Sequence, residues 1–148
     1  MGTREMKLAK RVLEVIPPSM AKIRLQMRAS SPRDVSVPQF RILGSIFRGR
    51  NLIGEMAKHL GVSQPATSKM VDALVEKGFV VRDPRSKDRR QIPLNLTITG
   101  NQFYLKIRQL AQVNMSRRIE QMTRAEHLAL EKGLDQIEKL FAIGEDRK

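Results

Sequence analysis

The sequence predicts a mainly helical domain with one small β-hairpin, and three observations lead to this prediction. Apolar residues recur at helical spacing over most of the chain. Gly61 and Gly78 each follow a short amphipathic segment, at the position where a left-handed conformation often ends a helix. Two short apolar runs flank a charged loop at residues 83–90. With 148 residues, of which 41% are hydrophobic, the chain has the size and apolar content of one ordinary domain.

The N-terminal segment is expected to be helical but interrupted. Residues 3–16 carry apolar side chains on one helix face. Pro17 and Pro18 follow, and proline fits the first turn of a helix but not its interior. We therefore expect a break or sharp kink at these prolines, a second helix from about residue 18 to 29, and then a loop.

Three shorter helices should follow this loop. Pro38 can begin the first, and the others run from about residue 52 to 60 and from about 63 to 77. Ser63 is a natural N-cap for the third, because its hydroxyl can accept a hydrogen bond from the first turn. Pro65 fits that turn, where the missing N–H has no partner within the helix.

A hairpin and two further helices complete the expected order, which is α-α-α-α-β-β-α-α when the interrupted N-terminal segment is counted once. Residues 79–82 are predicted to form one strand and residues 91–98 its partner. Thr99 can cap a helix at about residues 100–120, and Thr123 can open the last helix. Two short helices joined by a glycine turn and followed by a basic hairpin make a winged helix-turn-helix. The fold class is therefore mainly α with a small β-hairpin (α+β).

The charge of the chain favours a polyanionic partner. Its 28 Lys and Arg residues against 15 Asp and Glu give a net charge of +13. Such a charge raises the local concentration of protein near nucleic acid. A solvated basic surface without a partner is the alternative, and composition alone weights the two about evenly. Aromatic residues make up only 4% of the chain, which disfavours a protein that stacks single-stranded bases.

Several kinds of protein are disfavoured by what the sequence lacks. It has no cysteine, so disulfides, thiolate metal sites and thiol redox sensing are excluded. It has no apolar run of membrane-spanning length, and its N-terminus does not have the pattern of a secretory signal. We therefore expect a cytoplasmic protein.

The helix at residues 63–77 begins with small and polar residues, which suits entry into the major groove of DNA. In helix-turn-helix proteins the second helix places its N-terminal residues at the base edges. Gln64 can bond an adenine edge in two places, and Thr67 can offer a methyl group to thymine or a hydroxyl to an acceptor. Lys69 and the helix N-terminus can hold phosphates. A solvated polar face is the alternative. The predicted recognition residues are Ser63, Gln64, Pro65, Ala66, Thr67, Ser68 and Lys69.

The loop of the hairpin supplies a second predicted contact with DNA. An arginine at the tip of such a wing can enter a narrow minor groove, where the negative potential is enhanced. A nearby aspartate can hold that guanidinium extended by a charge-assisted pair. A charged, solvated hairpin tip is the alternative. The predicted wing residues are Arg85, Lys87, Asp88, Arg89 and Arg90.

Over roughly residues 16–143 the sequence resembles the multiple-antibiotic-resistance regulator (MarR) family of transcription factors. The resemblance is carried by Val37-Pro38-Gln39-Phe40, the turn from Ala57 to Gly61, the segment from Leu74 to Val80, Asp83-Pro84, Asp88-Arg89-Arg90 and Leu96-Thr97-Ile98-Thr99-Gly100. It implies a single domain in which residues 1–34 and 100–148 are dimerisation helices and residues 35–99 are the winged helix-turn-helix lobe. The Pro17-Pro18 pair departs from the family's first helix, so the N-terminal arm is expected to pack differently here.

The family resemblance also implies a mode of action. Each subunit of a homodimer places its recognition helix in the major groove of a palindromic site and its wing in the flanking minor groove. Asp88 and Arg90 match the family's wing motif. Many members respond to small effectors, often phenolic or other aromatic acids, that loosen DNA binding. The peroxide-sensing branch is excluded here because the chain has no cysteine.

No catalytic, metal or cofactor site is predicted. His59 and His127 are far apart in sequence, and no further ligands cluster with them. Arg24, Arg28 and Arg41 could hold an anionic effector or could equally be solvated. The methionines, among them Met27, are expected to fill gaps in the core and the dimer interface rather than to form a ligand pocket.

These observations together predict a non-enzymatic, sequence-specific regulator of transcription that binds double-stranded DNA. We expect a ligand-responsive repressor that acts as a homodimer on a palindromic operator. An architectural protein that coats DNA with little sequence preference is one alternative, since the net charge permits it. A winged helix that binds protein is the other, and the basic wing argues against it.

Overall fold

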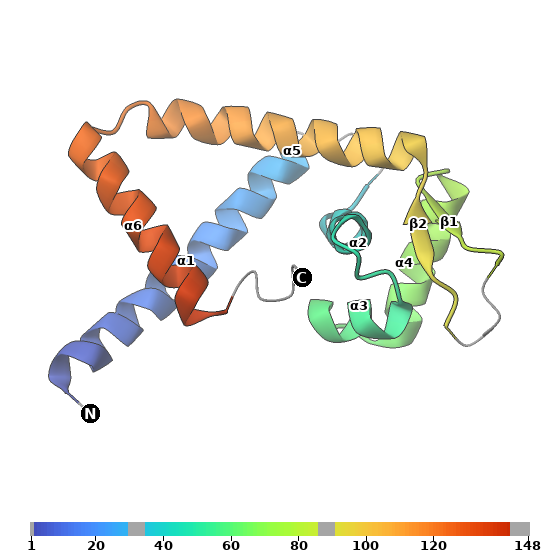
Figure 1. The fold of residues 1–148 in the computed structure, drawn as a ribbon, viewed down its shortest axis with the longest axis horizontal. Helices are drawn as coiled ribbons and strands as arrows, with labels where there is room; N and C mark the ends of the chain where they lie inside the picture. The colour runs from blue at the N-terminus through green and yellow to red at the C-terminus, as the bar shows by residue number, and fades with distance from the viewer. Residues whose placement is uncertain (1, 30–34, 86–90, 143–148) are drawn as a thin grey trace. The chain divides into compact units, whose positions relative to one another are not determined.

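A computed structural model describes residues 2–29, 35–85 and 91–142 of the chain (Figure 1). The chain divides into two compact units, residues 1–111 and residues 112–148. The described elements, in order, are α1 (Thr3–Ala29), α2 (Val37–Phe47), α3 (Ile53–Leu60), α4 (Gln64–Glu76), β1 (Val80–Arg82), β2 (Leu94–Leu96), α5 (Ile98–Ile119) and α6 (Arg124–Leu140). This order confirms the predicted fold class, a mainly helical chain with one small antiparallel hairpin.

Helix α1 is continuous through both prolines, so the predicted break and the second helix beginning at residue 18 are wrong. Pro17 and Pro18 each remove one backbone donor, but that loss is confined to one turn of a 27-residue helix. The hydroxyl of Ser19 donates to the carbonyl oxygen of Val15 at 2.7 Å and adds a hydrogen bond beside them. The regular turns on either side keep the helix in one piece.

The helix-turn-helix is fixed by local hydrogen bonds that the sequence predicts. The Ser63 hydroxyl accepts from the backbone N–H of Ala66 at 3.3 Å and caps α4, as predicted. Gly61 and Gly78 end α3 and α4 with φ angles of 68° and 72°, which confirms the left-handed conformation expected of them. Helix α2 starts with a capping box in which Ser36 and Gln39 exchange side-chain-to-backbone bonds.

The strands are shorter than predicted, and they pair antiparallel with Val80 opposite Leu96. Helix α5 begins at Ile98, so Thr99 does not cap it. Thr97 takes that role, because its hydroxyl accepts from the N–H of Gly100 at 2.9 Å. The same hydroxyl donates to the carbonyl of Gly78 at 2.6 Å, which joins the start of α5 to the end of α4.

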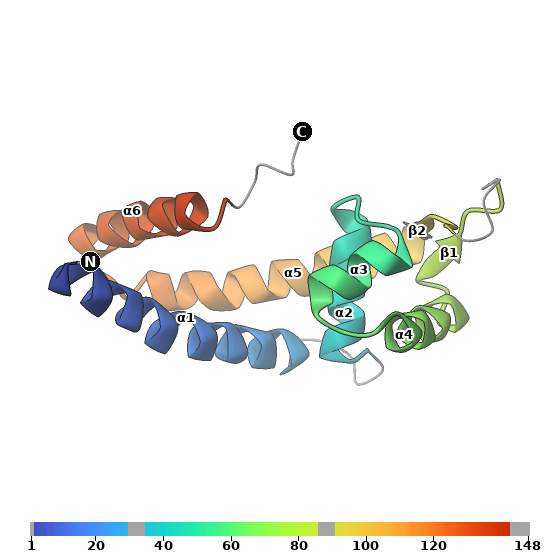
Figure 2. The ribbon, with the colours of Figure 1, turned by 90° about the horizontal axis from the view of Figure 1, so that it is seen from below.

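The core of the first unit holds the helix-turn-helix against the hairpin. Its buried residues come from α2, α3, α4, the two strands and α5. They are Ile42, Leu43, Ile46, Met56, Val71, Leu74, Val80, Leu94 and Tyr104. The ring of Tyr104 lies 5.1 Å from that of Phe40 and 4.9 Å from that of Phe47, measured between centroids. In both ribbon views α3 lies beside α4, and the hairpin follows α4 directly (Figures 1 and 2).

The second unit contains α6, which Thr123 opens, as predicted, and the structure shows a capping box there between Thr123 and Glu126. Hydrogen bonds from the backbone N–H and then the hydroxyl of Thr123 lower the pKa of Glu126. His127 Nε2 lies 2.7 Å from the carbonyl oxygen of Ile119, which ties α6 to the end of α5. No residue of α6 is buried. Among the described helices of both units, none is long and apolar enough to cross a membrane.

Candidate nucleic-acid interface

The beginning of α4 is a solvent-exposed surface of small and polar side chains. Its exposed members are Ser63, Gln64, Pro65, Ala66 and Lys69, and Ser68 is half-buried. The cap at Ser63 occupies that hydroxyl with a backbone N–H. Six of the seven predicted recognition residues therefore lie where a ligand can reach them, and their contact with bases stays a prediction.

Thr67 is the exception, and the prediction that its side chain reaches a base is wrong. It is 0% exposed, and its hydroxyl donates to the carbonyl of Ser63 at 2.9 Å. Thr67 precedes Val71 and Leu74 by four and seven residues, so it lies on the buried stripe of α4. This spacing was visible in the sequence.

Gln64 lies across the beginning of α3. A Cβ atom added at Gly54 would be 3.4 Å from Nε2 of Gln64, an ordinary van der Waals distance, so the Gln64 side chain lies close to Gly54. The Gln64 side chain thus lies near the surface of α3, beside the exposed first turn of α4.

A groove joins α3, the beginning of α4 and the base of the hairpin. The residues that line it are Leu52, Ile53, Gly54, Glu55, Lys58, Gln64, Pro65, Ser68, Arg82, Gln91 and Ile92. It contains three predicted recognition residues, and Lys58 and Arg82 bring positive charge to it. Neither of these two basic residues is among the predicted recognition or wing residues.

Arg82 connects the hairpin to α4. Its Nη2 donates to Oδ1 of Asp72 at 2.5 Å. In β1 the side chains of Val80 and Arg82 share one face of the strand, and Val80 is buried in the core. That alternation is the sequence signal that could have placed Arg82 toward α4.

The described part of the wing shows a second ion pair. Nε of Arg85 lies 3.1 Å from Oδ1 of Asp83, and the Arg85 side chain is 86% exposed. The hydrogen bond from the Arg85 side chain, followed by that from its backbone N–H, lowers the pKa of Asp83. Arg85 is thus at the surface, as a DNA contact requires. The other predicted wing residues, Lys87, Asp88, Arg89 and Arg90, lie outside the described residues.

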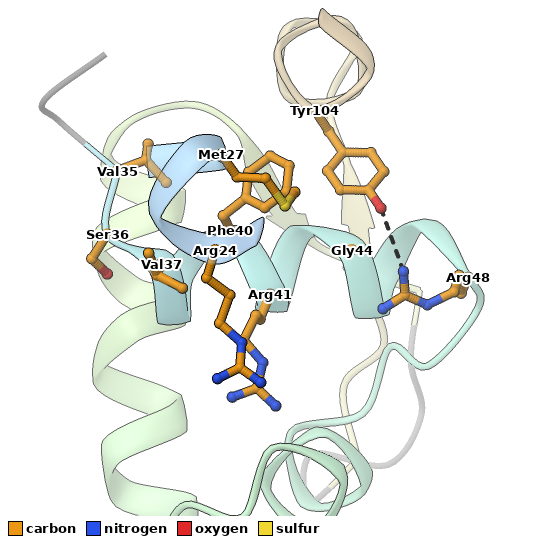
Figure 3. A pocket seen from close by; sticks show the side chains of 10 residues that line it. All are labelled: Arg24, Met27, Val35, Ser36, Val37, Phe40, Arg41, Gly44, Arg48 and Tyr104. Atoms are coloured by element: carbon orange, nitrogen blue, oxygen red, sulfur yellow. Dashed lines mark hydrogen bonds between the residues drawn. The ribbon is translucent and has the colours of Figure 1, made fainter. Parts of the chain in front are cut away.

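A separate pocket of about 150 Å³ lies between the C-terminal part of α1, α2 and α5, all within the first unit (Figure 3). Its lining residues are Arg24, Met27, Val35, Ser36, Val37, Phe40, Arg41, Gly44, Arg48 and Tyr104. The apolar members form its wall, and the residues described there include three arginines but no acidic side chain.

Two of these arginines lie close enough to affect each other. Figure 3 shows the side chains of Arg24 and Arg41 extending in the same direction. Arg41 is largely open to solvent, yet partial burial, and then the positive charge of Arg24, lower the pKa of its guanidinium. Arg48 Nη1 donates to the Tyr104 hydroxyl at 3.4 Å. The pocket thus combines an apolar wall with positive charge, whereas the Arg28 side chain lies outside the part that the structure describes.

Among the described residues, no three His, Asp or Glu side chains are grouped closely enough to hold a metal ion. His59 lies in α3, with Nε2 3.3 Å from Nη1 of Arg50, and His127 lies in α6.

Three helices, a glycine turn before an exposed helix and an antiparallel hairpin define a winged helix-turn-helix protein. Comparison with known proteins identifies the family. Residues 35–92 match the model of the MarR family. The chain is 31% identical over 109 residues to the multiple antibiotic resistance protein MarR of Escherichia coli, covering 73% of this chain and 76% of that protein. The chain belongs to the MarR family.

Two further comparisons define the extent of the likeness. An uncharacterized HTH-type transcriptional regulator of Bacillus subtilis, YfiV, is 26% identical over 68% of this chain, and the match spans 64% of its own length. The crystal structure of a mutant of E. coli MarR complexed with operator DNA has a TM-score of 0.62 and 28% identity. That match covers 86% of this chain and 93% of the other.

Proposed function

We propose that this chain is a non-enzymatic transcriptional regulator that binds a specific site on double-stranded DNA. The observation that carries the proposal is the exposed polar beginning of α4 beside a groove with Lys58 and Arg82, in a MarR-family chain. The likeness to an E. coli protein whose structure contains operator DNA supports it. The net charge of +13 favours attraction to phosphates. The regulator acts in the cytoplasm.

The regulator acts as a homodimer on a palindromic operator. In the first unit, α1 exposes large apolar side chains such as Met6, Leu8 and Leu13, the last 72% exposed. In the second unit, α6 buries no residue but exposes Leu128 and Leu134. Exposed apolar faces of this extent are common at protein–protein interfaces. A second copy of the chain would cover them, and a twofold dimer requires two matching half-sites.

The expected effect on transcription is repression, since a dimer bound at a promoter occupies DNA that the transcription machinery needs. The test is a footprint and an affinity titration on the DNA upstream of the protein's own gene, with random DNA as competitor. A protected palindromic segment bound roughly a thousandfold more tightly than random DNA supports a specific regulator. Uniform binding would favour an architectural protein that coats DNA with little sequence preference. No binding to DNA would favour a winged helix that binds protein.

Two further measurements separate the parts of this proposal. Sedimentation equilibrium reports the oligomeric state, and a monomer at micromolar concentration contradicts the dimer. Arg90→Ala is expected to weaken binding to the protected segment, because an arginine at a wing tip can enter the minor groove. Unchanged affinity would remove Arg90 from the interface without affecting the role of α4.

A second part of the proposal is response to a small anionic or aromatic effector bound in the pocket of α1, α2 and α5. The observation that favours it is the pairing of Arg24 and Arg41 at an apolar wall that has no acidic side chain among its described residues. A carboxylate between two guanidinium groups would make charge-assisted hydrogen bonds to both. Its aromatic ring would cover the apolar wall near Phe40.

Calorimetry with benzoate as the probe tests this assignment. Wild-type protein is expected to bind benzoate, and Arg41→Gln is expected to bind it about tenfold more weakly, since one charge-assisted bond is lost. Gly44→Ala should also weaken binding, because Gly44 lines the pocket and the added methyl group would take up part of its volume. Equal affinity of wild type and both variants would show that benzoate binds elsewhere.

A further inference from the structure

The ion pair of Arg82 and Asp72 joins the hairpin to the candidate recognition helix. Their side chains are 38% and 53% exposed. Exposed ion pairs contribute little to folding stability, because water screens the charges and ordering the side chains costs entropy. Stability alone therefore does not account for a contact that links the two elements expected to meet DNA.

The position of the pair points toward the recognition surface. Arg82 lines the groove together with Gln64 and Ser68. Asp72 follows Ser68 by four residues in α4, so both lie on the same face of that helix. The carboxylate thus holds the guanidinium beside the residues predicted to reach the bases.

The backbone that carries Arg82 is also held on both sides. The N–H of Asp83 donates to the carbonyl of Pro93 at 2.8 Å, and the N–H of Leu94 donates to the carbonyl of Asn51 at 3.0 Å. The base of the hairpin is therefore attached to the segment before α3 as well as to its own partner strand. A charged group on such a supported element is presented in a defined place.

We propose that Arg82 contacts a DNA phosphate from the base of the wing and that Asp72 is the residue that positions it. This inference rests on the proposed DNA-binding function. A guanidinium has five N–H donors in a planar fork, and the observed bond to Asp72 uses one of them. The remaining donors match the geometry of a phosphate. Because the side chain is already held, less rotamer entropy is lost when DNA binds.

The opposite relation is physically possible, and it makes the proposal testable. If Asp72 only sequestered Arg82, removing the carboxylate would free a cation and tighten binding. If Asp72 positions Arg82, removing it weakens binding even though the protein becomes more positive. The sign of the change therefore distinguishes the two.

The experiment compares variants on a duplex selected by the wild-type protein from a random-sequence library, with an unselected duplex beside it. The variants are Asp72→Asn, Arg82→Ala and their combination, and Glu76→Gln is the matched control. Glu76 lies one turn after Asp72 on α4, so its replacement changes the net charge equally without touching the pair with Arg82. Anisotropy titrations between about 50 and 200 mM salt give both affinity and salt slope.

Arg82→Ala is expected to weaken binding to the selected duplex and to reduce the salt slope by about 0.9, the value for one phosphate contact. Asp72→Asn should weaken binding about threefold to tenfold, with no further loss when it is added to Arg82→Ala. Glu76→Gln should keep or slightly raise affinity. Thermal unfolding of all four variants should stay close to wild type, because the pair is exposed.

Two results would overturn the inference while leaving the proposed function intact. One is an Asp72→Asn protein that binds the selected duplex as tightly as wild type or more tightly. The other is an unchanged salt slope in Arg82→Ala. Failure of the wild-type protein to select or bind any duplex would instead reject the proposed function itself, and this inference with it.

Discussion

Gly100 lies where the beginning of α5 meets the backbone of Phe79, and replacing it by alanine should destabilise the protein strongly. A Cβ atom built at Gly100 would lie 2.0 Å from the carbonyl oxygen of Phe79 and 2.8 Å from its carbonyl carbon. Contacts under 3.0 Å are essentially never seen for real Cβ atoms. The obstacle is main chain, so it cannot move aside as the end of a flexible side chain could.

The cost can be worked out from what must shift. Overpacking a well-packed region typically costs about 1–3 kcal/mol. The Phe79 carbonyl also accepts from the N–H of Thr97 at 3.0 Å, and losing that bond adds about 1 kcal/mol. Alanine in a helix recovers roughly 1 kcal/mol relative to glycine. Because the obstacle is main chain, the upper end of the overpacking cost applies, and Gly100→Ala should lower the free energy of unfolding by about 3 kcal/mol and Tm by about 10 °C.

The assay is urea unfolding monitored by circular dichroism at one fixed protein concentration. Gly133→Ala is the matched control, because Gly133 is also helical and a Cβ there would meet no atom within 4 Å. It should stabilise the protein by about 0.5–1 kcal/mol. A Gly100→Ala protein as stable as wild type would refute the close approach of α5 to Phe79.

Four other predictions concern the side chains of Thr67, Gln64, Ser45 and Glu126. Thr67→Val should lower the free energy of unfolding by about 1 kcal/mol, because the Thr67 hydroxyl donates to the carbonyl of Ser63, and it should leave the selected DNA consensus unchanged. Gln64→Ala should alter that consensus, and parallel binding-site selections test both variants. Ser45→Ala should leave the free energy of unfolding in urea unchanged or raise it, because the Ser45 hydroxyl is buried without a partner among the described residues. A decrease in that free energy of more than about 1 kcal/mol would contradict this prediction. The hydrogen bonds that lower the pKa of Glu126 stabilise the fold fully at pH values above the ordinary carboxyl pKa. This stabilisation is lost as the pH falls through the lowered pKa of Glu126. Glu126→Gln should thus reduce Tm at pH 7 but not in strong acid, and equal losses of Tm at both pH values would contradict a contribution from the ionised carboxylate.

The fold class could be predicted because most of its signals act over a few residues. A serine cap bonds to an N–H three positions on, and a glycine after a helix needs only its own φ angle. Ser63, Gly61 and Thr123 are therefore where the sequence places them. The same kind of reasoning fails at Pro17 and Pro18, because a local penalty does not decide whether a long helix continues past it.

The candidate site could be predicted less completely from the sequence, because its side chains are placed by tertiary structure. Thr67 resembles its polar neighbours in composition, but burial of the α4 stripe against the core takes it out of reach of DNA. Arg82 and Asp72 are ten residues apart, and only the packing of β1 beside α4 brings them together. Arg24, Arg41 and Tyr104 come from three helices and share a pocket because those helices meet. The sequence by itself determined the order of elements and the exposed beginning of α4, since these follow from local hydrogen bonding and periodicity. The pairing of charges and the shape of the pocket were decided by contacts between distant segments, which no local pattern encodes.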